Sequence, residues 1–329
     1  MKLMILAIGG NSLIRAGEKG TVAEQVANAR APAVEIVGLL RAGYRMVITH
    51  GNGPQVGAAL LRSERAAAQV AGQSLDVCDA STQGEIGYIL QQALNNELAA
   101  AGLKVPVISV LTQCVVSAND PAMLHASKPI GPFYSRSDAE ERRRRYGWEI
   151  VEDAARGYRR IVPSPEPVEI VELDTIRELV RKNVVVIACG GGGIPVVRRN
   201  GVLTGVEAVI DKDRASALLA MSLGADRFVI STDTDFVYLN YREPSQRALT
   251  CVTERELEYY ADSGQFPEGS MGPKIESVIR FMKSGGEEAI ITSTKGLCDA
   301  VAGIAGTHIV RSEEKPVPRF EAELQVKGN

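Results

Sequence analysis

The chain has 329 residues, 45% of them hydrophobic, with a formal net charge of −3 at pH 7 and an isoelectric point near 5.8. This length is enough to bury a large core, as one α/β domain or two lobes. Basic and acidic residues are mixed along a slightly acidic chain, which gives no reason to expect a nucleic-acid partner. We interpret the arginine run at residues 142–145, beside Glu140 and Glu141, as a solvated helix face.

Several other classes of protein are also disfavoured. No apolar run approaches the roughly 18 residues that span a bilayer, so we expect no membrane partner. Residues 1–8 are apolar but short, and we interpret them as a buried first strand and not as a signal peptide. The five cysteines form no CxxC pair, which is typical of reduced thiols in a cytoplasmic protein. The three histidines match no zinc-binding pattern, so we predict no metal site formed by protein side chains.

Short apolar runs alternate with long amphipathic segments along the chain. In chain order, the patterns predict strands over residues 2–8, 44–48, 105–111, 183–188, 227–231 and 288–292, and helices over residues 24–42, 54–68, 80–101, 213–223, 254–263 and 273–284. The strand runs rarely alternate polar with apolar residues, as expected when both sheet faces are buried. This order predicts an α/β fold, a three-layer αβα sandwich with a mostly parallel central sheet.

Two stretches of the chain interrupt this alternation of predicted strands and helices. Residues 114–167 are rich in Pro, Arg and aromatic residues and are too long for a plain loop, so we expect an inserted subdomain or lid. Residues 312–329 are charged and contain two prolines, which predicts a loosely attached tail.

Glycine-rich segments follow three predicted strands. They are Gly9, Gly10 and Asn11 after the first strand, Gly51, Asn52 and Gly53 after the second, and Gly190, Gly191, Gly192 and Gly193 after the strand at residues 183–188. Ligands of open parallel sheets bind beyond the carboxyl ends of the strands. Glycine lets backbone N–H groups approach phosphate oxygens, and a helix N-terminus adds positive partial charge. Each segment alone is equally well explained as a tight turn, but the three together favour a site for several anionic groups.

Neither common nucleotide motif is present, because the dinucleotide fingerprint has the wrong spacing and the P-loop is absent. Phosphoryl transfer without a P-loop still needs positive charge on the transferring oxygens. Lys128, Lys212 and Lys274 stand among Gly, Pro and apolar residues and are the candidates, with a solvated surface charge as the alternative for each. Asp211 and Asp213 flank Lys212 and can hold its ammonium group or cap the following helix.

Residue chemistry alone leaves two possible roles for each of two further features. The Thr-Asp-Thr-Asp segment at residues 232–235 follows a predicted strand, where it could meet a nucleotide or its Mg²⁺, or simply form an Asx-turn. His50 stands beside a glycine loop, and a packing or backbone-bonding role is at least as well supported as catalysis.

Together these segments resemble the amino acid kinase family, and within it the carbamate kinases, over residues 2–310. The glycine segments recur across the family. Two pieces are far more specific: Lys-Pro-Ile-Gly-Pro-Phe at residues 128–133 and Tyr-Arg-Arg-Ile-Val-Pro-Ser-Pro at residues 158–165. Both lie in the insertion, which in carbamate kinases is a protruding lid over the active site.

The resemblance implies the amino acid kinase fold, with a kinase domain over residues 1–311 that divides near residue 180 into an N-lobe and a C-lobe. It also implies a homodimer that depends on Mg²⁺. The implied reaction is reversible: carbamoyl phosphate and ADP give ATP and carbamate, which breaks down to ammonia and CO₂. The phosphoryl group would pass directly, in line, without a covalent enzyme intermediate.

The resemblance also implies a role for each matching residue. The groups that would bind the carbamoyl and transferred phosphoryl groups are Gly9, Gly10, Asn11, Gly51, Asn52 and Gly53. Lys128 would reach down from the lid, Lys212 would neutralise the phosphoryl group in flight, and Asp211 would orient the lysines. Lys274 would hold the ADP phosphates. The implied nucleotide pocket contains Gly191, Asp233, Tyr238, Met271 and Pro273.

The sequence departs from the family pattern at four positions. Asp79, Ser81 and Glu85 stand where Gly, Met and Met are usual, and Glu166 stands where a basic residue is common. These changes add polarity and negative charge near the expected site or dimer contact. They leave two alternatives open: a kinase for another small carboxylate or carbamate-like acceptor, and a non-catalytic nucleotide-binding paralogue.

Overall fold

The computed structural model describes residues 1–9, 12–15, 17–152, 157–267 and 269–312. Its centre is an eight-stranded sheet with the order β15–β17–β16–β12–β1–β2–β9–β3. The strands are β1 (Leu3–Ile8), β2 (Arg45–His50), β3 (Val107–Ser109), β9 (Val185–Ile187), β12 (Arg227–Thr232), β15 (Cys251–Thr253), β16 (Glu288–Ser293) and β17 (Thr307–Val310). Every neighbouring pair is parallel except β16–β17, so the predicted mostly parallel sheet is confirmed.

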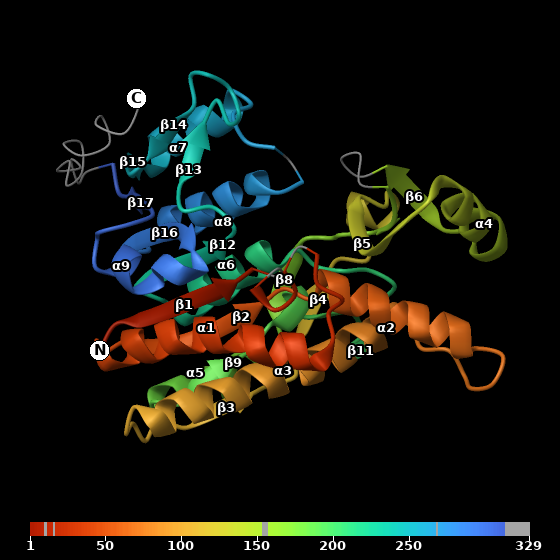
Figure 1. The fold of residues 1–329 in the computed structure, drawn as a ribbon, viewed down its shortest axis with the longest axis horizontal. Coiled ribbons are helices and arrows are strands. Elements are labelled where there is room, and N and C mark those ends of the chain that lie inside the picture. Colours follow the sequence, from red (N-terminus) through yellow and green to blue (C-terminus); the bar gives the residue numbers. More distant parts are fainter. Residues whose placement is uncertain (10–11, 16, 153–156, 268, 313–329) are drawn as a thin grey trace.

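Helices cover both faces of this sheet (Figure 1). They are α1 (Val22–Arg41), α3 (Leu75–Ala100), α5 (Leu173–Arg181), α6 (Lys212–Leu223), α7 (Glu254–Asp262), α8 (Met271–Lys283) and α9 (Leu297–Val301). Side chains of β1 alternate between two cores: Leu3 and Ile5 pack with α5, α6, α7 and α8, and Met4 and Leu6 with α1, α3 and α9. The predicted three-layer sandwich is confirmed. Within the described part of the chain, no helix has the length and hydropathy needed to cross a membrane.

Two smaller sheets flank the central one. The strands β11 (Val202–Gly205), β10 (Ile194–Arg199), β4 (Gln113–Val116) and β8 (Pro167–Ile170) form a four-stranded sheet, and β13 (Val237–Leu239) pairs with β14 (Arg247–Leu249). Short 3₁₀ turns are η2 (Pro121–Met123), η3 (Gly190–Gly192) and η4 (Thr294–Gly296). The turn η3 links β9 of the central sheet to β10, so the run of four glycines lies where the two sheets meet.

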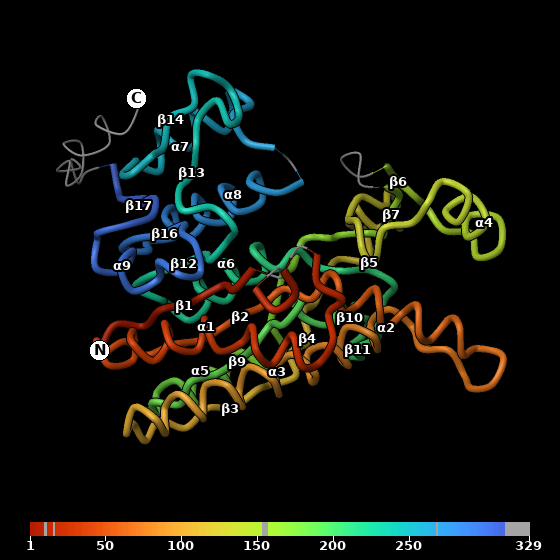
Figure 2. The backbone as a smooth tube through the Cα atoms, viewed as in Figure 1, coloured from red at the N-terminus to blue at the C-terminus, as the bar shows by residue number. Residues whose placement is uncertain are grey.

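A separate three-stranded sheet stands out from the body of the molecule, at the right of Figure 1. It consists of β5 (Lys128–Tyr134), β7 (Tyr158–Val162) and β6 (Glu149–Glu152), with α4 (Arg136–Tyr146) beside it. We call this sheet and α4 the projecting unit. The helix α2 (Gly53–Ala66) extends to the same side in the trace of Figure 2 and packs against β5. Within the expected insertion at residues 114–167, β4 pairs into the four-stranded sheet, and the projecting unit begins at Lys128.

Most predicted elements agree with the structure within about two residues at each end; the start of α3 differs by more, and β3 is shortened at both ends. The helix α3 begins at Leu75, five residues before the predicted start, because Leu75 is fully buried and its backbone N–H donates to Glu207 Oε1 at 2.9 Å. The strand β3 covers only Val107–Ser109 of the predicted 105–111, where it pairs with β9. The predicted tail lies outside the described residues apart from Ser312.

Candidate active site

Three lysines from separate parts of the fold converge on two aspartates. Lys128 begins β5 in the projecting unit, Lys212 begins α6, and Lys274 lies in the first turn of α8. Lys128 Nζ forms an ion pair with Asp211 Oδ2. Asp213 binds the other two: its Oδ1 lies 2.6 Å from Lys212 Nζ and its Oδ2 lies 2.8 Å from Lys274 Nζ. The structure therefore gathers all four residues that the sequence suggested for catalysis.

The two aspartates divide the roles that the sequence left open. Asp211 is the N-cap of α6, where its Oδ1 accepts hydrogen bonds from the backbone N–H groups of Asp213 at 2.9 Å and Arg214 at 3.3 Å. Its other oxygen holds Lys128. Asp211 therefore caps a helix and anchors the projecting unit, and Asp213 holds the ammonium groups of Lys212 and Lys274.

Burial and charge act in opposite directions on the pKa values of this cluster. Burial lowers the pKa of Lys212, whose side chain is 12% exposed, and the nearby Lys274 adds to the effect. Burial would lower the pKa of Lys274 too, but Asp213 more than offsets it and the pKa lies above its ordinary value. Burial would raise the pKa of Asp213, yet the two lysines hold it well below its usual range.

The charge balance of the cluster favours an anionic ligand. Three ammonium groups face two carboxylates, a formal excess of one positive charge, and each ammonium keeps N–H donors beyond the one given to its aspartate. The N-termini of α6 and α8 add positive partial charge at the same place. Such a cluster can bind and neutralise phosphoryl oxygens.

The first two glycine segments lie on adjacent strands. Ile8, the last residue of β1, pairs with His50, the last residue of β2, so the segments after them begin side by side. A Cβ on Gly9 would lie 3.1 Å from the carbonyl oxygen of Ser231, whereas one on Gly53, the first residue of α2, would face open space. Gly51 N–H donates to the Ile8 carbonyl at 3.2 Å. Gly10 and Asn11 lie outside the described residues.

The run Gly190–Gly193 is explained by close packing. A Cβ on Gly190 would lie 2.5 Å from the His50 ring, and one on Gly191 would lie 2.2 Å from Asn52 Nδ2. Gly191, Gly192 and Gly193 also have φ values of +68°, +101° and +91°, which favour glycine. The same loop approaches the lysine cluster, since a Cβ on Gly192 would lie 2.3 Å from the Ile210 carbonyl oxygen, one residue before Asp211.

The side-chain amide of Asn52 is held by α3. Asn52 Nδ2 donates to Asp79 Oδ1 at 2.6 Å and to Thr82 Oγ1 at 2.8 Å. One turn further on, Gln83 Nε2 donates to the carbonyl oxygens of Thr112 at 3.1 Å and Gly190 at 2.9 Å. All six of these residues are buried. The buried polar face of α3 therefore fixes both the Asn52 loop and the glycine run.

Thr82 and Gln83 were not among the residues that the sequence suggested. A signal was nevertheless present, because residues 79, 82 and 83 share one face of a helix at spacings of three and four, between buried apolar residues. Polar side chains on a buried helix face need partners, which here are the loops of the site.

Two of the residues expected to bind nucleotide, Met271 and Pro273, lie in the first turn of α8. Met271 opens this helix and packs against the core on that side of the sheet, and Pro273 lines a hollow between α6, α7 and α8. The charge of Asp233 acts on Lys274. Tyr238 is on β13. Gly191 lies apart from them, against Asn52. Their roles in binding stay predictions.

His50 carries no charge in this site, and the described residues contain no group of side chains suited to a metal ion. His50 is 2% exposed, and burial lowers its pKa to about 4, so the ring is neutral at pH 7 and adds no positive charge to the site. Its Nδ1 lies 3.2 Å from the Gly51 carbonyl oxygen, which fits the packing or backbone-bonding role. No group of three or more His, Cys, Asp or Glu side chains suited to a metal ion occurs among the described residues.

Among the described residues, none of the other three departures from the family pattern forms an ion pair with the three lysines. Ser81 is exposed on α3, and Glu85 accepts a hydrogen bond from Gln25 Nε2 at 3.3 Å. Glu166 forms an ion pair with Arg280 of α8. Of the four, Asp79 alone contacts a residue of the candidate site in the described structure.

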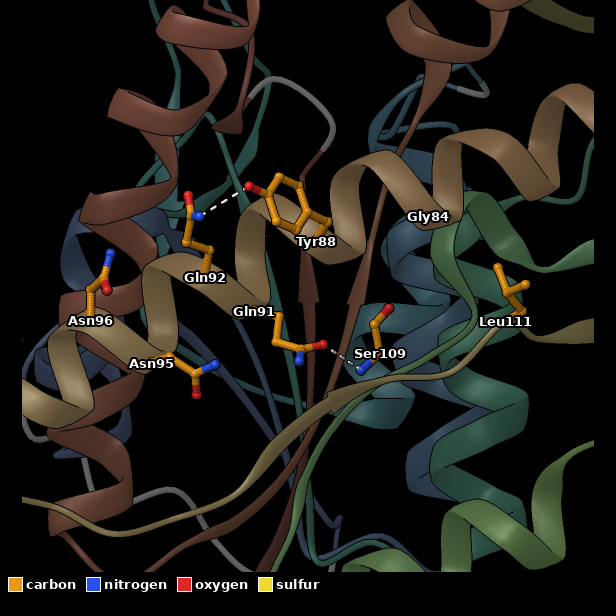
Figure 3. A pocket seen from close by; sticks show the side chains of 8 residues that line it. All are labelled: Gly84, Tyr88, Gln91, Gln92, Asn95, Asn96, Ser109 and Leu111. Atoms are coloured by element: carbon orange, nitrogen blue, oxygen red, sulfur yellow. Dashed lines mark hydrogen bonds between the residues drawn. The ribbon is translucent and has the colours of Figure 1, made fainter.

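A second hollow lies on the outer face of α3, beside the edge strand β3 (Figure 3). It is lined by Gly84, Tyr88, Gln91, Gln92, Asn95, Asn96, Ser109 and Leu111. None of these residues is charged. Gln92 Nε2 donates to the Tyr88 hydroxyl at 3.0 Å, and Ser109 N–H donates to Gln91 Oε1 at 3.0 Å. This hollow is distinct from the lysine cluster.

Comparison with known proteins agrees with the fold. The model of the amino acid kinase family matches residues 2–293. Carbamate kinase of Thermococcus kodakarensis is 48% identical over 315 residues, covering 94% of this chain and all of the relative. Carbamate kinase of Pyrococcus furiosus is 45% identical over 311 residues, covering 94% of this chain and 99% of the relative.

Solved structures give the same result. Carbamate kinase from Giardia lamblia bound to AMP-PNP superimposes with a TM-score of 0.88 at 41% identity, covering 94% of this chain and 98% of that one. The chain therefore belongs to the amino acid kinase family.

Proposed function

We propose that this protein is a carbamate kinase, which transfers a phosphoryl group reversibly between ATP and carbamate. The observation that carries the proposal is the convergence of Lys128, Lys212 and Lys274 on Asp211 and Asp213. The named relatives support carbamate as the acceptor, since several carbamate kinases are 43–48% identical over nearly the whole chain.

In the synthetic direction, a carbamate oxygen attacks the γ-phosphorus of ATP, and the bond from that phosphorus to the bridging oxygen of ADP breaks. Lys212 is the first residue of α6 and its ammonium is held by Asp213, a position from which it can follow the equatorial oxygens in flight. Lys274 would hold the phosphates that remain on ADP. Lys128 enters from the projecting unit and would close over the acceptor side. Catalysis is then positioning plus charge neutralisation, with no covalent enzyme intermediate.

The glycine segments would complete the acceptor and phosphoryl pocket. We assign this role to Gly9, Gly10, Asn11, Gly51, Asn52 and Gly53, whose described members follow β1 and β2 side by side. Gly191 packs against the Asn52 amide. The nucleotide would lie toward α8, with Asp233, Tyr238, Met271 and Pro273 around it.

Mg²⁺ is the divalent ion that we propose for the reaction. The carboxylates nearest the lysines are poor candidates for metal ligands, because Asp213 binds a lysine with each oxygen and Asp211 binds Lys128 and two backbone N–H groups. The ion would therefore arrive on the phosphate oxygens of the nucleotide, where it would neutralise part of their charge.

Incubation with carbamoyl phosphate, ADP and Mg²⁺ is expected to form ATP, measured by coupled luminescence. Lys128→Ala should lower kcat/KM for carbamoyl phosphate by roughly a hundredfold, because one charged donor to the transferred group is lost. Lys104→Ala is the control, since Lys104 is exposed and lies before β3. An acceptor panel of small carboxylates in the reverse direction separates this function from a kinase for another acceptor. Nucleotide binding without ATP formation would instead indicate a non-catalytic paralogue.

We also propose a homodimer in the cytoplasm. No disulfide bond occurs among the described residues, which is consistent with a reducing compartment. The outer face of α3 and β3 suits a second copy: Tyr88 and Leu111 are 61% and 55% exposed, the hollow between them is lined by uncharged residues, and β3 is an edge strand.

Size-exclusion chromatography with light scattering tests this dimer. The protein is expected at twice its chain mass of 35.2 kDa, and Tyr88→Glu is expected at the single-chain mass, because a charge would be buried in the interface. Tyr259→Glu is the matched control, since Tyr259 is 70% exposed on α7. A single-chain mass for the unmodified protein would contradict the dimer, and an unchanged mass for Tyr88→Glu would contradict this face.

A further inference from the structure

We propose that Asp79, together with Thr82, is a positioning residue for acceptor specificity: it orients the Asn52 amide so that the carbonyl oxygen Oδ1 accepts a hydrogen bond from the amino group of the acceptor. This inference rests on the proposed function. It concerns a residue of the buried helix α3 that touches no reacting atom and acts through Asn52.

The orientation of the Asn52 amide is fixed by two acceptors on α3. Nδ2 carries two N–H groups, and Asp79 Oδ1 at 2.6 Å and Thr82 Oγ1 at 2.8 Å account for both. Asp79 Oδ1 can accept whether the carboxyl group is ionised or neutral. With Nδ2 turned to α3, Oδ1 faces away from that helix, and it accepts no hydrogen bond from any described residue.

The glycine loop that packs against the amide runs on to the lysine cluster. A Cβ on Gly191 would lie 2.2 Å from Asn52 Nδ2 and 2.7 Å from Oδ1, so only a residue without a side chain fits beside the amide. The next residue, Gly192, approaches the carbonyl oxygen of Ile210, and Asp211 with its partner Lys128 follows directly. Asn52 also occupies the N-cap position of α2, without a side-chain capping hydrogen bond, in the loop proposed to bind the acceptor.

The chemistry of the acceptor explains why a carbonyl oxygen is needed there. The only hydrogen-bond donors of carbamate and carbamoyl phosphate are the hydrogens of the amino group, because every oxygen of these ions accepts. The lysines and the loop N–H groups are donors and recognise those oxygens. An oriented acceptor such as Asn52 Oδ1 can therefore select the amino group over a methyl group, which leaves the buried carbonyl unpaired.

A contribution to the stability of the fold does not explain why an aspartate stands at position 79. Its side chain is fully buried, and Oδ2 has no hydrogen-bond partner among the described residues. Burial raises the pKa of Asp79 well above its usual range, and Asp76 on the same helix adds to the effect, whereas the hydrogen bond from Asn52 opposes it. A buried carboxyl group with an unpaired oxygen destabilises the folded state, so its presence at the Asn52 loop indicates a functional role.

The experiment compares carbamoyl phosphate with acetyl phosphate, which has a methyl group in place of the amino group. The ratio of the two kcat/KM values for ATP formation is measured for the unmodified protein and for Asp79→Ala, Asp79→Asn, Thr82→Val and Thr82→Ser. We expect Asp79→Ala and Thr82→Val to lower this preference for carbamoyl phosphate by roughly fivefold to tenfold, mainly through KM for carbamoyl phosphate. Asp79→Asn and Thr82→Ser keep an acceptor oxygen and should retain most of the preference.

A stability measurement separates positioning from a structural role. For an acid whose pKa is raised by folding, the folded state binds the proton more tightly, so stability falls as pH rises from the ordinary Asp value of 3.8 through the raised value. The Asp79→Ala variant lacks this carboxyl group and therefore does not lose stability in this way as the pH rises. Urea unfolding should therefore show the variant at least as stable as the unmodified protein at pH 8, with its advantage shrinking toward pH 5.

The outcomes are distinct. Reduced preference with undiminished stability at pH 8 supports the inference. An unchanged ratio in Asp79→Ala overturns it, as does a lower ratio accompanied by loss of stability at every pH. If the unmodified protein forms no ATP from carbamoyl phosphate, the proposed function fails first, and that result is separate from any difference between the variants.

Discussion

Replacing Lys212 with alanine is expected to lower kcat by roughly a hundredfold to a thousandfold, the range seen when one preorganised donor to a developing charge is removed. Lys212 is the most buried of the three lysines, with 12% of its side chain exposed, so little water can take the place of its ammonium group. KM for ADP should change much less, because Lys274 remains to hold the ADP phosphates. Steady-state kinetics of ATP formation measure both.

The control for Lys212→Ala must exclude a folding defect. Asp213 would keep Lys274 as its partner, so its charge is not left alone in the interior. Far-UV circular dichroism and the urea midpoint should show a folded protein, and Lys104→Ala should retain full activity. A kcat within threefold of the unmodified protein, in a folded variant, would show that Lys212 does not act on the transferred group.

Gly57→Ala is expected to displace the projecting unit and to lower kcat/KM by about as much as Lys128→Ala, roughly a hundredfold. A Cβ on Gly57 of α2 would lie 1.8 Å from the Cα of Gly131 in β5, and no rotamer change can relieve a clash with backbone. Gly131 is three residues from Lys128, so a shift of β5 moves this lysine away from Asp211.

The size of this effect is informative because helix propensity predicts the opposite. Alanine favours a helix interior over glycine by about 1 kcal/mol, so Gly57→Ala should stabilise α2 itself. Gly84→Ala is the matched control, since Gly84 is also helical and a Cβ there faces open space. In a double-mutant cycle, Gly57→Ala should add little to Lys128→Ala. Additive losses would mean that the contact acts on something other than Lys128.

Much of the fold could be predicted from the sequence because its strands are short apolar runs at regular intervals. The parallel sheet, both helical layers and the three glycine segments followed from that pattern. The start of α3 was missed because Asp76 and Asp79 resemble loop residues, although one is buried. Burial of a polar side chain depends on the tertiary partner, here Asn52, and local sequence does not reveal that partner.

The candidate site could be predicted where glycine and lysine stand in unusual sequence surroundings. The contact that requires each glycine could not be predicted from the sequence. Gly190–Gly193 were expected to approach phosphates, whereas the structure shows that neighbouring protein groups fill the space beside them. The contact between Gly57 and Gly131 joins residues 74 positions apart in the chain, and no local pattern indicates it. Pairings of this kind follow only from the packed structure.

The glycine run also limits how this loop can change during evolution. At Gly192 the obstacle is the backbone oxygen of Ile210, so no substitution elsewhere can make room. At Gly193 the obstacle is the side chain of Cys114, but the φ of +91° would still strain any other residue. Gly190 has no positive φ and is opposed by the His50 ring. Among diverged relatives, positions 190 and 50 are therefore the pair in this loop where compensating substitutions should covary.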